Sequence, residues 1–212
     1  LQYSRGVDTL VTDAISLNID AEKGHYDYQL QSEFFDAGID GTFSWGPLFE
    51  NFYSDLAVIF PSLKVGTKKK GREDELRDNH LVEFFIKSKS VDSLLNFFTS
   101  GVHLDSASLI SGRYNAYSHD LDLDVEISSL LFGDVRIDGL FGEQQLHNDS
   151  IFADYLVDFI TYKDSLRFNL IEFYTFGTQG VLESQLSWDP VSDRYSKIDW
   201  ETSIHDKDHV EI

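Results

Sequence analysis

The stretch HDLDLDVEISSLLFGDVRIDGL, residues 119–140, decides the fold class of this chain. Its first half alternates strictly between acidic and apolar residues, and strict alternation places the two kinds on opposite faces of a β-strand. The odd-numbered apolar phase begins at Leu121 and continues to Ile137. We therefore expect one apolar face, and one acidic face that meets water.

Similar alternating segments recur roughly every 10–15 residues, the spacing typical of short strands joined by tight turns. The sequence thus predicts an all-β fold, mainly an antiparallel meander that curls into an elongated, taco-like groove or a sandwich. Two short amphipathic helices are predicted at residues 46–61 and 90–101, where apolar residues follow three-and-four spacing. We expect these helices to plug an end of the sheet or to cover an open edge.

The charge of the chain is strongly negative, with 17 Lys+Arg against 37 Asp+Glu and a formal net charge of −20. Such a charge repels nucleic acid, and it gives no attraction to anionic lipid surfaces. Without cysteine there is no disulfide framework and no thiol nucleophile. No apolar run is long enough to span a membrane, and no signal region opens the chain.

The ends of the sequence suggest a piece of a longer protein, because the first residue is Leu1 and methionine is absent. We expect residues 1–212 to form a single β-rich fragment of a longer repeat protein. Residues 66–79 are rich in charge and poor in apolar residues, which predicts a flexible surface loop.

Closely spaced carboxylates invite a calcium or glycosidase interpretation, as at Asp120, Asp122 and Asp124. A straight strand cannot converge the roughly six to eight oxygens that calcium needs. The histidine pair His205 and His209 has the spacing of a helical zinc site, but its surroundings predict a strand. No nucleophile elbow, phosphate loop or dinucleotide motif occurs. We therefore expect no enzyme, no cofactor and no metal.

The apolar face can serve either as a packed core or as a groove for cargo. An acyl chain is a natural guest for a groove, because each methylene group removed from water contributes about 0.8 kcal/mol. A core filled by facing strands is the alternative that periodicity leaves open. The candidate lining residues for acyl chains are Leu121, Leu123, Val125, Ile127, Leu131, Val135, Ile137, Phe168, Leu170, Leu182, Leu186 and Trp188.

The order of three segments resembles a known family. YDYQLQSEFFDAGIDGTFSW is followed by a helix ending in FP, by VEFFIKSKSVDSLLNFFTSGVHL, and by LISGRYNAYSHDLDLDVEISSLLFGDVRIDGL. This order is similar to the Bacteroidota-type repeat body of the TamB family (translocation and assembly module), within the AsmA-like superfamily. The similarity lies in a repeat pattern and not in a catalytic motif, so it predicts the architecture more specifically than the mechanism.

The resemblance implies a periplasmic segment of a protein that is anchored in the inner membrane by a helix outside this sequence. It implies an apolar β-groove that shields phospholipid acyl chains between the two membranes and supports outer-membrane biogenesis and protein assembly. A BamA/TamA-like outer-membrane barrel is the implied partner, met through regions outside this sequence.

Two other function classes stay open at this point. The first is a closed β-sandwich that recognises glycan or protein through Trp45, Trp188 or Trp200. The second is a hydrolase built on paired carboxylates.

Overall fold

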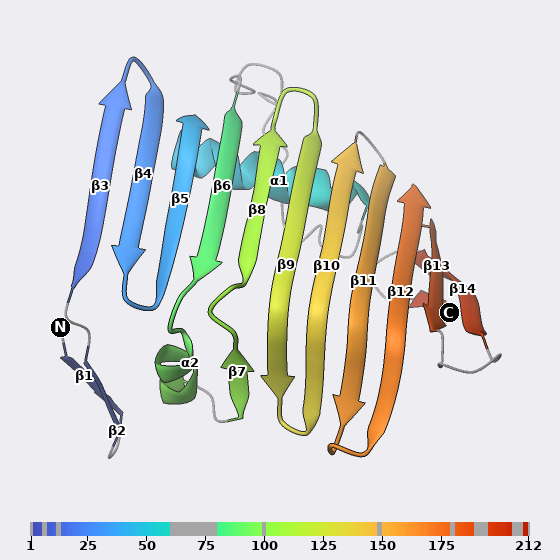
Figure 1. Ribbon diagram of the computed structural model, residues 1–212. Coiled ribbons are helices and arrows are strands. Elements are labelled where there is room, and N and C mark those ends of the chain that lie inside the picture. Colours follow the sequence, from blue (N-terminus) through green and yellow to red (C-terminus); the bar gives the residue numbers. More distant parts are fainter. Residues whose placement is uncertain are drawn as a thin grey trace.

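The computed structural model describes residues 2–5, 8–11, 14–59, 80–98, 101–147, 150–178, 181–188, 195–204 and 210–211. The predicted loop at 66–79 and the pair His205 and His209 lie outside these residues. At the N-terminal end, β1 (Gln2–Arg5) pairs with β2 (Asp8–Val11) in a separate small sheet. The other described strands all belong to one large sheet (Figure 1).

The large sheet has thirteen strands, and twelve of them lie in chain order from β3 to β15. The remaining strand, β7, pairs with β9 off this path. The strands are β3 (Ile15–Glu22), β4 (His25–Ser32), β5 (Phe35–Thr42), β6 (Leu81–Ser88), β7 (Val102–Leu104), β8 (Leu109–Asn115), β9 (Asp120–Phe132), β10 (Val135–His147), β11 (Ser150–Tyr162), β12 (Leu166–Thr178), β13 (Val181–Trp188), β14 (Ser196–Ile204) and β15 (Val210–Glu211). Every pairing is antiparallel, which confirms the predicted all-β antiparallel meander.

Helix α1 (Trp45–Ile59) lies on one face of this sheet, behind β6, β8 and β9 in Figure 1. Its first turn begins where the amide of Leu48 donates to the carbonyl of Ser44 at 2.9 Å, and Pro47 is tolerated there because the first turn leaves amides unpaired. Leu48 is buried against the sheet, whereas Phe49 on the far side is 61% exposed. The expected helix is confirmed, but it covers a face and not an end or edge.

Helix α2 (Asp92–Phe98) confirms the second expected helix. The amide of Leu95 donates to the carbonyl of Val91 at 2.8 Å, so the helix begins beside the buried Val91. The Asp92 carboxylate accepts a hydrogen bond from the amide of Leu104 at 2.9 Å, which fastens α2 to β7. No helix that the structure describes is long and apolar enough to cross a bilayer.

Register divides the side chains of the sheet into two sets. We call the face that carries α1 the inner face and the opposite one the outer face. Leu121 of β9 belongs to the inner face, with Tyr114 of β8 and Leu146 of β10 as its cross-strand partners. Because cross-strand partners share a face, the registers assign other strand residues in the same way.

The sheet is open and not closed into a sandwich within the described residues. Strands β3 to β12 lie side by side in Figure 1, and β13 and β14 are seen nearly edge-on where the sheet turns. This turning agrees with the predicted curl. It follows the normal right-handed twist of neighbouring strands, which accumulates over a wide sheet.

Candidate functional site

The part of the inner face beneath α1 is a packed core. Phe43, Val82, Tyr114, Leu121 and Leu146 meet here, and Leu121 is 6% exposed. The ring of Phe52 from α1 stands edge-on to the ring of Tyr114, with 5.4 Å between their centroids. This region is packed by the protein's own side chains.

A buried polar group fastens α1 to this core. The Asp55 carboxylate, 3% exposed, accepts a hydrogen bond from the hydroxyl of Tyr114 at 2.6 Å. Its other oxygen lies 2.6 Å from Nδ1 of His119, in the turn between β8 and β9. Since an ionised carboxylate only accepts hydrogen bonds, both neighbours act as donors. The helix is thereby held across the sheet.

Beside α1 the inner face forms a hollow of about 240 Å³ across β3 to β6. Its walls are almost entirely carbon. The lining residues are Leu17, Tyr28, Leu30, Ala37, Gly38, Ile39, Phe84, Phe85 and Ile86. Leu17 and Ile86 are 57% and 49% exposed, so their apolar surfaces are open to an incoming ligand. A hollow of this kind can take a hydrocarbon and has little to offer a polar solute.

Farther along the inner face, aromatic rings from β11, β12 and β14 lie next to one another on the sheet. Tyr155 and Phe173 are cross-strand partners with ring centroids 6.3 Å apart, and Phe173 lies 6.0 Å from Trp200. The Tyr155 ring occupies the space that a side chain at position 142 would fill, so Gly142 lets this ring lie against the backbone. Burial raises the pKa of the Tyr155 hydroxyl above its usual value near 10.0. The ring therefore lies in a poorly hydrated part of the face.

The twelve predicted lining residues fall into two groups. Leu121, Leu123, Val125 and Ile127 share the inner face, as alternation along β9 requires. Three of the predicted residues on β13 also lie on the inner face, because their cross-strand partners on β12 belong to this face. The β13 members are Leu182, Leu186 and Trp188.

Val135 and Ile137 do not share the face of Leu131, so the single odd-numbered phase is wrong beyond β9. The turn between β9 and β10 has only two residues, which makes Phe132 the partner of Val135 and Leu130 the partner of Ile137. Even-numbered residues of β9 therefore match odd-numbered residues of β10.

The alternation of faces is interrupted near this end of the sheet by residues with positive φ. Leu170 adopts a positive φ of 46°, and the ring of Phe168 stands edge-on to the ring of Trp188 with their centroids 6.3 Å apart, so Phe168 lies on the side of the inner-face residue Trp188. By register, the residues that share a face with Phe168 at this end are Leu130, Phe132, Val135, Ile137, Ile160, Tyr162 and Leu166. The residues on the opposite face in the same rows are Ser129, Leu131, Arg136, Asp138, Phe159, Thr161, Arg167 and Asn169.

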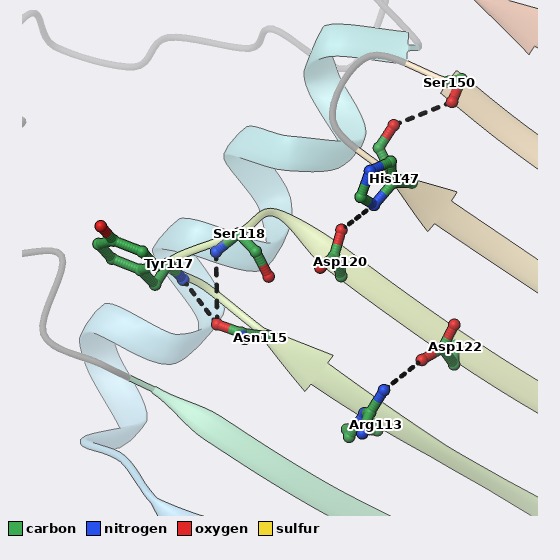
Figure 2. A network of polar contacts seen from close by, with 8 residues as sticks. All are labelled: Arg113, Asn115, Tyr117, Ser118, Asp120, Asp122, His147 and Ser150. Carbon is green, nitrogen blue, oxygen red and sulfur yellow. Dashed lines mark hydrogen bonds and ion pairs between the residues drawn. The ribbon is translucent and has the colours of Figure 1, made fainter.

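The acidic side of β9 forms ordinary surface contacts on the outer face (Figure 2). Asp122 accepts a hydrogen bond from Arg113 at 3.1 Å, and Asp120 contacts the imidazole of His147. Glu126 and Asp124 are exposed along the same strand. Among the residues that the structure describes, no cluster of three His, Cys, Asp or Glu side chains is arranged to hold a metal ion.

The tryptophans considered for glycan or protein recognition do not form one patch. Trp188 and Trp200 are half-buried on the inner face, and Trp45 begins α1. The hollow, in contrast, uses residues that the sequence analysis did not choose. The alternation of Leu17 with its neighbours and of Ile86 with Phe84 was visible, but the place of α1 beside them was not.

Comparison with protein-family models, with curated proteins and with solved structures finds no match to this chain.

Proposed function

We propose that this chain is a non-enzymatic periplasmic segment of a TamB-like protein, whose inner face shields phospholipid acyl chains between the inner and outer membranes. The observation that carries the proposal is the carbon-lined hollow beside α1. A ligand that enters it gives up hydration without gaining hydrogen bonds, so the ligand must itself be apolar there. Acyl chains satisfy this condition.

The hollow is large enough for part of one acyl chain. Its volume of about 240 Å³ equals that of about eight water molecules in the liquid. If about eight methylene groups replaced this water, the gross gain would be about 6 kcal/mol before the entropy loss of association. The gain suits a carrier, because a ligand held this loosely can leave again.

The wider role rests on the resemblance of the segments at 26–45, 82–104 and 109–140 to the TamB repeat body. In this proposal, regions outside the sequence provide the inner-membrane anchor and meet a BamA/TamA-like barrel. The acidic outer face stays in water. Support of outer-membrane biogenesis and protein assembly follows from the same placement.

The test is uptake of a fluorescent fatty acid by delipidated protein, with Ile86→Glu compared to Lys87→Glu. Ile86 lines the hollow, whereas Lys87 is the next residue of β6 and projects to the outer face. Both changes put a glutamate on the same strand, so Lys87→Glu is a matched control. We expect Ile86→Glu to weaken fatty-acid binding about tenfold or more, because a tenfold change corresponds to the burial of about two methylene groups. The Lys87→Glu variant should bind the fatty acid like the wild type.

Melting curves of both variants must match the wild type for the comparison to count. Equal effects of the two substitutions, or no uptake at all by the folded wild-type protein, would contradict the proposal.

A further inference from the structure

A second hollow, of about 410 Å³, lies on the outer face across β8 to β11, and we call it the outer hollow. No residue with positive φ occurs at 109–114, 121–126, 141–146 or 151–156, so alternation holds along these stretches. The lining side chains therefore lie opposite to the core residues of the same strands, which are Tyr114, Leu121, Leu146 and Ile151. The side chains that line the outer hollow are Leu109, Ser111, Asp124, Glu126, Phe141, Glu143, Asp154 and Leu156.

An apolar row crosses the floor of the outer hollow. Phe141 of β10 is the cross-strand partner of Leu156 of β11, and Leu109 of β8 lies in the same row, with Glu126 of β9 between it and Phe141. Phe141 is 46% exposed and Leu156 is 39% exposed. This row therefore offers apolar surface to a partner that approaches the outer face.

An acidic row runs beside the apolar row, two residues away along each strand. Glu143 has Asp124 and Asp154 as its two cross-strand partners. Like charges directly opposite one another are destabilising, and no ion pair within the described residues compensates any of these three. Asp122 of β9, by contrast, pairs with Arg113 at 3.1 Å. A cation supplied by a partner would relieve the repulsion in the acidic row.

The surroundings of the outer hollow suit a helix better than an added strand. β9, β10 and β11 are each paired with a strand on both sides, so an extended peptide cannot join the sheet there. A helix pairs its own backbone groups internally. The three inter-strand intervals from β8 to β11 span about 14 Å, the length of about ten helical residues. On the inner face, α1 lies across the strands in this way (Figure 1).

The charges of the outer hollow determine the chemistry of the partner. A second copy of the chain would bring further carboxylates, and its helices α1 and α2 contain no Lys or Arg. An anionic bilayer is likewise repelled, and a pure hydrocarbon would take water from the carboxylates without pairing them. Lys and Arg have long apolar stems and charged ends, so they can contact the apolar row and the acidic row together.

We propose that the outer hollow is the docking site for a basic amphipathic helix of a partner protein. The apolar stripe of this helix lies on the apolar row, and its Lys or Arg side chains reach the acidic row. The proposal goes beyond the proposed function, which keeps the outer face in water and so leaves the outer hollow accessible. A partner bound there leaves the carbon-lined hollow on the inner face open.

The experiment measures binding of fluorescein-labelled peptides to the full chain by fluorescence anisotropy. Both peptides have about 18 residues, long enough to form a helix. One carries a leucine stripe flanked by lysines, and the control carries the same stripe flanked by glutamates. We expect the glutamate peptide to bind at least about tenfold more weakly. The affinity of the lysine peptide should fall as NaCl is raised, because salt screens exposed charges.

Two matched triple variants locate the site. The first neutralises the acidic row through Asp124→Asn, Glu143→Gln and Asp154→Asn. The second neutralises three cross-strand neighbours on the outer face of β3 to β5 through Asp20→Asn, Asp27→Asn and Asp40→Asn. Both remove the same charge. We expect the first to weaken lysine-peptide binding about tenfold, because three exposed ion pairs each contribute roughly a factor of two, and the second to weaken it less than about twofold.

The apolar row is tested by Phe141→Ala, which should weaken lysine-peptide binding about fivefold because about half of the ring is left to bury. Phe49→Ala, at a 61% exposed ring on α1, is the control and should bind the peptide like the wild type. Melting curves of all variants must match the wild type.

Equal weakening by the two triple variants, equal binding of the two peptides, or no binding of the lysine peptide to the folded chain would overturn the proposal. Dimers in sedimentation that Phe141→Ala dissociates would identify a second copy as the occupant and overturn it as well. Fatty-acid uptake should be unchanged in all these variants, so a failure here leaves the proposed function standing.

Discussion

Removing the Asp55 carboxylate tests how α1 is held on the sheet. Asp55 is 3% exposed and accepts hydrogen bonds from Tyr114 and His119, each at 2.6 Å. A hydrogen bond to a charged group contributes about 1.5–3 kcal/mol, and loss of one partner from a buried charged pair costs about 3–5 kcal/mol. Because the His119 side chain is 26% exposed, water can hydrate it after the carboxylate is removed. We therefore expect Asp55→Ala to lower the free energy of unfolding by about 3 kcal/mol.

The measurement is urea unfolding followed by circular dichroism, with the free energy of unfolding extrapolated to water. Tyr114→Phe removes only one donor and should cost about 1–2 kcal/mol. The double mutant should lose less than the sum of the two single changes, because both remove the same hydrogen bond. Asp124→Ala, at an exposed aspartate of β9, is the control and should stay within about 0.5 kcal/mol of the wild type.

A loss below about 1 kcal/mol for Asp55→Ala, or strict additivity with Tyr114→Phe, would refute this reasoning. A loosened α1 would also uncover Leu121 and its neighbours, so a dye that binds apolar surface should fluoresce more strongly with Asp55→Ala in the absence of urea.

Two further predictions concern glycine and tyrosine. Gly112→Ala should lower the free energy of unfolding by about 1–3 kcal/mol, because the new methyl group would lie 2.6 Å from the carbonyl oxygen of Asp122 and 2.7 Å from the Phe84 ring. The control is Gly46→Ala in the first turn of α1, where the methyl group meets nothing within 4 Å and the change should be neutral or stabilising. The urea midpoints of the two variants test both predictions. The raised pKa of Tyr155 means that its neutral form stabilises the fold fully below the unfolded value near 10.0 and that this stabilisation is lost as pH rises through the folded pKa. Urea midpoints measured from pH 9 upward should therefore fall less steeply with Tyr155→Phe than with the wild type, and parallel slopes would contradict the assignment.

Within a single strand, the sequence alone predicted which side chains share a face. The alternation from Leu121 to Ile127 predicts one shared face because the side-chain period of a strand is two, and the structure agrees. It was insufficient across turns: the two-residue turn before Val135 pairs this residue with Phe132 and reverses the parity. Odd numbering alone therefore cannot predict which residues share a face on two strands that a turn separates.

The candidate site depends on contacts that local patterns do not contain. Asp55 and His119 are separated by 64 residues, and no local pattern signals that they meet. Amphipathic spacing predicted α1 itself, yet Phe49 is on the exposed side and Leu48 on the buried one. The contact between Phe168 and Trp188 likewise becomes visible only in the structure, because the positive φ of Leu170 interrupts the alternation of faces along β12.

The position of α1 limits what the inner face can hold. Beneath α1 the face is packed by the protein's own side chains, and beside α1 it forms the carbon-lined hollow across β3 to β6. A closed sandwich would cover this hollow with a second sheet, and the large sheet has no such partner sheet over it among the described residues. In the proposed function the guest is an acyl chain, which needs no polar partner in the hollow.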